Sequence, residues 1–258
     1  MKQKTQTVLL RFGYRGKIFH GLQAQPGLPT VERELRARLE QLCNDRLVAL
    51  NFAGRTDAGV SANQNAATFR LPDGNGLSQL LSAYKSLSCE QLWVTNALRV
   101  PRSVNARNSV LHKLYRYRIR WGSTTPHNEQ TWAISPALNV DRMRDAALQL
   151  TGTHDFSAFR SAGCGAKSAT KTVNSIKVIA ERDAVRLDIT GTRFLRRMVR
   201  IMAGTLAEVG AGLLSAEQVL LARESKRRAQ AGITAPATGL TLERIWFGEA
   251  IEQQLLAQ

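Results

Sequence analysis

Several common features are scarce or missing in this chain of 258 residues, and each absence excludes a class of protein. The apolar runs are short and interrupted by Arg, Gly or Gln, well below the roughly 20 residues of a membrane span. The three cysteines and four histidines are scattered, so the sequence predicts neither a disulfide framework nor a metal site. The N-terminus does not read as a signal peptide, and we expect a cytoplasmic protein with no membrane contact.

Acidic residues are also scarce. Asp and Glu number 20 against 36 Lys and Arg, which gives a formal net charge of +16. Such an excess indicates a polyanionic partner, with nucleic acid favoured over an anionic membrane surface. The positive charges are spread along the chain, which favours a folded basic surface over a basic tail. Hydrophobic residues make up 43% of the chain, enough for the core of a globular protein.

Hydrophobic periodicity predicts an α+β protein with a largely antiparallel sheet. We expect strands over residues 8–12, 47–52, 60–69, 92–98, 112–121, 172–180, 185–190 and 240–247. We expect helices over residues 30–44, 77–87, 139–150 (closed by Gly152), 194–209 and a short stretch opened by a capping box at 215–218. A Thr/Pro-rich joint at 123–126 divides the chain into an N-terminal half, 1–122, and a C-terminal half, 123–258.

The most informative stretch is residues 54–60, Gly-Arg-Thr-Asp-Ala-Gly-Val. Two strand-like runs flank it, so we expect Asp57 on a tight loop that rigid elements hold open to a ligand. A carboxylate presented in this way can act as a nucleophile, and a nearby guanidinium would keep it ionised. The spacing alone also describes an ordinary turn, in which an Asp side chain bonds to its own backbone.

Two further patterns have both a structural and a functional interpretation. Tyr115 and Tyr117 alternate with basic residues, which is typical of a half-buried strand as well as of a nucleic-acid surface. Arg196, Arg197 and Arg200 share one side of the long predicted helix. A solvated cationic face explains that arrangement as well as RNA binding does.

Four segments make the chain similar to the TruA family of tRNA pseudouridine synthases. Residues 54–60 correspond to the family's catalytic motif, and residues 113–118 to its basic-Tyr-x-Tyr strand. Residues 194–200 correspond to its arginine-bearing helix, and residues 234–242 to its C-terminal Ala-Pro-Ala-x-Gly-Leu signature. The match spans nearly the whole chain in the expected order. The resemblance implies the pseudouridine synthase fold, a mixed, mostly antiparallel sheet with flanking helices and two similar halves that meet at a catalytic cleft.

The resemblance also implies a function, the isomerisation of uridine to pseudouridine in the anticodon arm of tRNA. Asp57 would be the nucleophile on a flipped-out uridine, Tyr115 would stack on that base, and Arg55 would fill the space it leaves or bind the adjacent phosphate. Arg200 would hold the nucleophile ionised. Further RNA contacts are expected from Arg107, Lys113, Arg116, Arg193, Arg196, Arg197 and Leu240. The family needs no cofactor or metal and works as a homodimer, so we expect the same here.

Several supporting positions depart from the family pattern, among them Arg15, Leu22, Ser61, Lys85 and Cys89. These departures leave the RNA target and the exact target nucleotide open, and the sequence does not indicate which atom the nucleophile attacks. Two alternatives therefore remain, a synthase retargeted to another RNA and a catalytically silent RNA-binding protein. The presence of all four expected catalytic residues argues against the silent protein.

Overall fold

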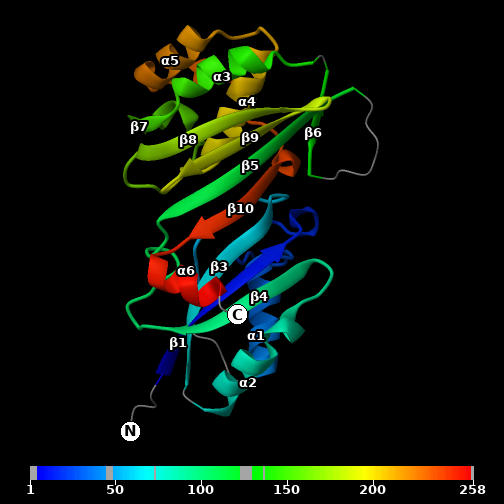
Figure 1. Cartoon of the computed structure of the whole chain (residues 1–258), viewed down its shortest axis with the longest axis vertical. Coiled ribbons are helices and arrows are strands. Elements are labelled where there is room, and N and C mark those ends of the chain that lie inside the picture. Colours follow the sequence, from blue (N-terminus) through cyan, green and yellow to red (C-terminus); the bar gives the residue numbers. More distant parts are fainter. Residues whose placement is uncertain (1–4, 45–48, 73, 123–129, 136, 257–258) are drawn as a thin grey trace. The chain divides into compact units, whose positions relative to one another are not determined.

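The computed structural model describes residues 5–44, 49–72, 74–122, 130–135 and 137–256. The chain forms two compact units, a first unit of residues 1–111 and 242–258 and a second unit of residues 112–241 (Figure 1). The predicted joint at 123–126 and the first two residues of the predicted strand 47–52 lie outside the described residues. The division into halves at residue 122 stays a prediction. The predicted α+β class, with mostly antiparallel strands and flanking helices, is confirmed.

The sheet of the first unit is built around β1 (Thr5–Tyr14). This strand pairs antiparallel with β3 (Ser61–Pro72) on one side and with β4 (Leu92–Val100) on the other. The short strand β2 (Asn51–Phe52) pairs antiparallel with β3. Every residue of β1 from its third position onward is buried, which explains why its apolar run is continuous rather than alternating.

The helices of the first unit begin and end close to the predicted positions. In α1 (Val31–Cys43) the N-cap is Thr30, whose hydroxyl accepts the Arg33 N–H at 3.4 Å. The residues that α1 buries recur at every fourth position: Val31, Leu35, Leu39 and Cys43. The predicted helix 77–87 is α2 (Asn75–Ala83), followed by a 3-10 turn over Tyr84–Leu87.

A C-terminal helix that the sequence did not predict completes the first unit. The chain passes through β10 (Leu240–Trp246) and then forms α6 (Glu249–Leu256). The Glu252 carboxylate accepts a hydrogen bond from Arg11 Nη2 at 3.0 Å and another from the Phe247 N–H at 2.9 Å. Burial lowers the pKa of the Arg11 guanidinium, and the nearby Glu252 raises it again. Glu252 therefore ties α6 to the central strand.

The second unit has its own run of paired strands. Its strands β5 (His112–Trp121), β9 (Ala184–Gly191), β8 (Thr170–Glu181) and β7 (Gly152–Asp155) follow one another as antiparallel neighbours. The short β6 (Trp132–Ile134) pairs parallel with β5, so the sheet is mixed. The predicted hairpin between β8 and β9 is confirmed, and both short strands, β6 and β7, were missed because three or four residues carry too little periodicity.

Three helices form a layer on the sheet of the second unit (Figure 1). They are α3 (Val140–Leu148), α4 (Met198–Gly210) and α5 (Ala216–Ser225). The predicted capping box of α5 is confirmed: Ser215 Oγ accepts the Gln218 N–H at 3.3 Å, and Gln218 Oε1 accepts the Ser215 N–H at 2.8 Å. α4 is buried along nearly its whole length, which makes it the core of this layer.

Two predicted helix ends were wrong. α3 ends at Leu148, and Gly152, with φ +111°, begins β7 instead of closing the helix. The helix predicted to begin at residue 194 begins only at Met198, because Arg197 is in the left-handed conformation, with φ 60°. A right-handed helix cannot run through a left-handed residue, so residues 196–197 form a turn before it.

The ion pair between Arg11 and Glu252 generates a stability prediction. Replacing Glu252 with Gln (E252Q) leaves the buried Arg11 cation without its counter-charge. We expect the free energy of unfolding to fall by about 3 kcal/mol, as when one partner of a buried pair is removed. Urea denaturation followed by circular dichroism measures this loss. The matched control is Glu249→Gln, an exposed carboxylate on the same helix, which should change stability by less than about 0.5 kcal/mol. Equal losses in both variants would contradict a special role for Glu252.

Candidate functional site

Asp57 lies on the loop between β2 and β3 in the first unit, as predicted. Its carbonyl accepts the Val60 N–H at 3.2 Å, which closes a tight turn, and Gly59 takes up the positive φ of +80° that this turn needs. The Thr56 carbonyl accepts the Leu22 N–H at 3.2 Å. The Asp57 side chain is half-buried. The loop thus has a backbone held on both sides of an acidic residue.

Arg55, on the loop, and Tyr14, at the end of β1, differ in their exposure to solvent. Arg55 is exposed, which leaves its guanidinium accessible to a polyanion. Tyr14 is fully buried, and its hydroxyl shares a hydrogen bond with Thr56 Oγ1 at 2.7 Å. Burial raises the pKa of Tyr14 to about 12, so its hydroxyl keeps its proton at neutral pH. Tyr14 is therefore a neutral support for the loop rather than an acid or a base. The sequence did not single out this role.

In the second unit, Tyr115 and Tyr117 project from β5 on the same side of the strand. Tyr115 is 7% exposed, and its ring meets Phe194 edge to face at a centroid distance of 5.2 Å. Tyr117 is fully buried and donates its hydroxyl to the Pro236 carbonyl at 2.7 Å. Burial raises the pKa of Tyr117 above its ordinary value. The interpretation of Tyr117 as a core residue is therefore correct, and Tyr115 has an aromatic neighbour that orients its ring.

The prediction that Arg196, Arg197 and Arg200 share one side of a helix was wrong for the first two. Arg196 and Arg197 are exposed residues of the turn before α4, and only Arg200 lies within the helix. Arg200 Nε donates to the Ala235 carbonyl at 2.8 Å, which connects α4 to the C-terminal signature segment. The Arg196 N–H donates to Cys164 Sγ at 3.4 Å. Arg197 is the N-cap of α4, and its carbonyl accepts the Ile201 N–H at 2.9 Å, so the turn presents its two arginines directly before the helix.

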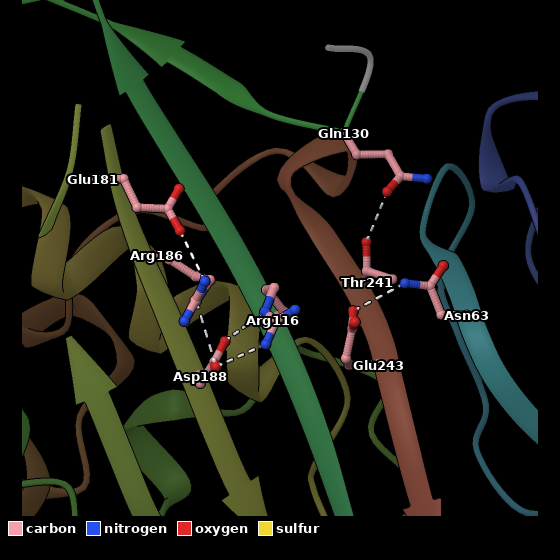
Figure 2. Close-up of polar contacts among 8 residues, drawn as sticks. All are labelled: Asn63, Arg116, Gln130, Glu181, Arg186, Asp188, Thr241 and Glu243. Atoms are coloured by element: carbon pink, nitrogen blue, oxygen red, sulfur yellow. Dashed lines mark hydrogen bonds and ion pairs between the residues drawn. The ribbon is translucent and has the colours of Figure 1, made fainter. Parts of the chain in front are cut away.

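Arg116 is held in an ion-pair network that the sequence did not reveal. Its Nε and Nη2 donate to Asp188 Oδ1 and Oδ2 at 2.7 and 2.9 Å, a two-point contact across the β5–β9 pair (Figure 2). Arg186 Nε lies 3.5 Å from Asp188 Oδ2, and Arg186 Nη1 donates to Glu181 Oε1 at 2.9 Å. The sequence predicted the hairpin that contains Asp188 and Arg186. It did not predict how this hairpin aligns with β5, and that alignment brings Arg116 next to Asp188.

A different group of cations gathers where β5, β8 and β9 meet. Lys113 lies opposite Gly191 in the sheet, Arg193 follows two residues later, and Lys171 lies near the start of β8. Burial, and then the nearby Arg193, lower the pKa of Lys113 to about 8. Burial lowers the pKa of Lys171, Cys164 raises it in part, and Arg193 lowers it again. Within the described part of the chain, none of these three cations forms an ion pair with a carboxylate. Their mutual repulsion would be relieved by a bound anion.

The remaining predicted contacts are separate. Arg107 is exposed, and its N–H is held by Asn105 Oδ1 at 2.9 Å. Leu240, by contrast, is 6% exposed. Among the described residues, no group of three or more His, Cys, Asp or Glu side chains is arranged to hold a metal ion. No described helix is long and apolar enough to cross a membrane.

Comparison with known proteins decides the family. A family profile described as tRNA pseudouridine synthase matches residues 146–247. The tRNA pseudouridine synthase A of Myxococcus xanthus is 39% identical to the chain over 241 residues, which cover 92% of this chain and 91% of that protein. The chain belongs to the tRNA pseudouridine synthase A (TruA) family.

Other comparisons extend this result. The tRNA pseudouridine synthase A of Geobacter sp. (strain M21) is 35% identical over 247 residues, 95% of this chain and 100% of that protein. Among solved structures, a Cbf5-Nop10-Gar1 complex matches 83% of this chain and 54% of the matched chain, with 12% identity and a TM-score of 0.33. A TM-score this low carries no weight for the fold, so the family rests on the sequence similarity.

Two departures from the TruA pattern have structural roles. Ser61 Oγ accepts the Gly16 N–H at 3.0 Å, where the family has a histidine. Gly16 packs so closely that a Cβ there would lie 2.3 Å from the Val60 carbonyl carbon. Leu22 is fully buried. Both departures therefore serve the packing behind the Asp57 loop. Arg15 is exposed and has no role that the structure explains.

Proposed function

We propose that this protein is an isomerase that converts uridine to pseudouridine in tRNA, in the anticodon arm, with Asp57 as the nucleophile. The observation that carries the proposal is an acidic residue, half-buried on a loop with a fixed backbone, in a chain of the TruA family. The curated relatives are named tRNA pseudouridine synthase A. A carboxylate held in this way is suited to attack a substrate without prior rearrangement.

The chemistry requires few groups. The reaction breaks an N-glycosidic bond, turns the uracil and rejoins it through carbon, so nothing is oxidised and nothing leaves. No cofactor is needed. The target base must leave its stack, which costs a few kcal/mol. Stacking on Tyr115 would offset roughly 1–3 kcal/mol of this cost, and the exposed Arg55 would fill the vacated space or bind a phosphate. Arg200 is the fourth residue of this proposed catalytic set.

We assign RNA binding first to those cations that form no ion pair with a carboxylate among the residues that the structure describes. Lys113, Lys171 and Arg193 form such a group in the second unit, and the exposed Arg196, Arg197 and Arg107 add to the basic surface. Arg116 is different, because its guanidinium is bound at two points by Asp188. We assign Arg116 to the organisation of β5 and β9 rather than to a phosphate. Leu240 has little exposed surface, so its proposed contact with the RNA is an apolar one with a base.

The family resemblance further implies a cytoplasmic homodimer. Light scattering of the purified chain measures its mass in solution, and the expected value is twice that of the 28.5 kDa chain. A mass equal to one chain would show that this property of the family does not carry over.

Mapping of pseudouridine tests the reaction directly. Unmodified tRNA transcripts and rRNA fragments are incubated with the wild-type protein, with Asp57→Ala, and with Glu90→Gln, which alters an exposed carboxylate of the same unit. We expect pseudouridine in the anticodon arm with wild type and Glu90→Gln and none with Asp57→Ala. RNA affinity should stay within a few-fold in all three, because phosphate contacts dominate affinity.

The site of the signal distinguishes the alternatives. An Asp57-dependent signal elsewhere in tRNA or in rRNA would make the protein a retargeted synthase. Tight, salt-sensitive binding with no pseudouridine on any RNA would make it a binding protein. Loss of RNA affinity in Asp57→Ala would show that Asp57 supports the structure instead of the reaction.

The lowered pKa of Lys113 gives the tRNA affinity a defined dependence on pH. Below pH 8 this side chain is charged and available to a phosphate, and above pH 8 it is largely neutral in the free protein. We expect affinity to fall about 3- to 10-fold between pH 7 and pH 9, since binding must restore the lost proton. Lys113→Arg stays charged over this range and should show no such fall. Parallel pH curves for the two proteins, measured by filter binding, would remove Lys113 from the RNA surface.

A further inference from the structure

A buried side-chain amide holds the first residue of the Asp57 loop. Asn65, on β3, has no exposed surface. Its Oδ1 accepts the N–H groups of Gly54 at 3.1 Å and Ala66 at 2.8 Å. Its Nδ2 donates to the Gly54 carbonyl at 2.8 Å and to the Tyr14 hydroxyl at 3.4 Å. An amide side chain has two N–H donors and one oxygen with two acceptor positions, so all of these are in use.

Where β2 ends, the side chain of Asn65 takes the place of a paired strand. The Ala53 N–H still donates to the Ala66 carbonyl at 2.9 Å, as backbone in a strand pair does. At Gly54 the chain turns away, and the Asn65 side chain takes over both backbone groups of that residue. Gly54 is buried, so these groups would otherwise lack partners at a cost of about 1–3 kcal/mol each. The loop can therefore begin inside the protein.

Tyr14 extends the same network to the residue before Asp57. Its buried hydroxyl accepts from Asn65 Nδ2 and shares a hydrogen bond with Thr56 Oγ1. A continuous chain of hydrogen bonds thus runs from Gly54 through two buried side chains to Thr56. Networks of this kind, with every member satisfied, hold one arrangement of the backbone against its alternatives.

We propose that Asn65, Tyr14 and Thr56 are positioning residues that hold the backbone of the Asp57 loop in the geometry of nucleophilic attack. This inference rests on the proposed function, because it concerns the rate of the Asp57-dependent reaction. The three side chains act through the backbone and need not touch the RNA. Misplacement of a reacting group by about 1 Å can cost about 100-fold in rate. Removing one bond of the network should therefore reduce the chemical step far more than RNA binding.

The Thr56 hydroxyl offers a matched pair of variants. Thr56→Val keeps the shape of the side chain and removes its hydroxyl, whereas Thr56→Ser keeps the hydroxyl. With an unmodified tRNA transcript, we expect the single-turnover rate constant to fall at least about 10-fold in Thr56→Val, with Kd for the RNA unchanged within about 2-fold. Thr56→Ser should recover most of the rate. A loss from missing bulk would affect Ser more than Val.

Tyr14→Phe tests the other end of the same hydrogen bond. It removes the hydrogen bond to Thr56 and also the one from Asn65, so the rate should fall at least as far as with Thr56→Val. The double variant Tyr14→Phe/Thr56→Val should lose little more than Tyr14→Phe alone, because Tyr14→Phe already removes the interaction that Thr56→Val removes. Thr153→Val is the control. It removes an exposed hydrogen bond of 2.8 Å between the hydroxyls of Thr153 on β7 and Thr172 on β8, and it should keep the wild-type rate.

The outcomes separate this inference from the function on which it rests. If wild type makes no Asp57-dependent pseudouridine, the proposed function fails and this inference fails with it. Should wild type be active and both Thr56→Val and Tyr14→Phe retain its rate, the network does not position the nucleophile. A fall in RNA affinity as large as the fall in rate, or additive losses in the double variant, would also overturn it. Should Tyr14→Phe fail to fold, the Thr56 pair still decides the question.

Discussion

The loop that carries Asp57 depends on how its buried backbone groups are satisfied. A chain that leaves a sheet inside a protein exposes an N–H and a C=O that no strand can pair, and such groups are costly when they are buried without partners. Here the side-chain amide of Asn65 binds both groups of Gly54. The amide is itself held by Tyr14, so the departure from the sheet is bound on both sides of the Asn65 side chain. An acidic side chain is therefore presented on a loop whose first residue is hydrogen-bonded inside the protein, whereas most loops run over the surface.

The distribution of charge follows a related division. The chain has few acidic residues, and several of them are bound to particular cations within their own unit. Glu252 pairs with Arg11, and Asp188 pairs with Arg116. Among the described residues, Lys113 and Arg193 form no such pair, and burial, followed by the nearby Arg193, lowers the pKa of Lys113. Neighbouring cations without a carboxylate between them favour the binding of an anion. Part of the net charge of +16 is therefore concentrated near Lys113 and Arg193.

Much of the fold could be predicted because it depends on local signals. The helix α1 has an N-cap threonine and apolar residues at every fourth position, and α5 has a capping box. The β8–β9 hairpin has alternating strands and a short turn. The start of α4 was wrong because no propensity scale anticipates a left-handed Arg197, and α6 was missed because Glu252 holds it through a partner 241 residues away in the chain.

The sequence by itself determined the family, the acidic loop residue, the tyrosine strand and the basic character, since each depends on residue type and order along the chain. The tertiary structure decided which polar groups support that loop and which cations are already paired. Asn65 and Tyr14 are 51 positions apart, and Arg116 and Asp188 are 72 apart. Both pairs come into contact only through strand register. Register is set by the packing of whole sheets, and a shift of one residue would turn each of these side chains to the opposite face.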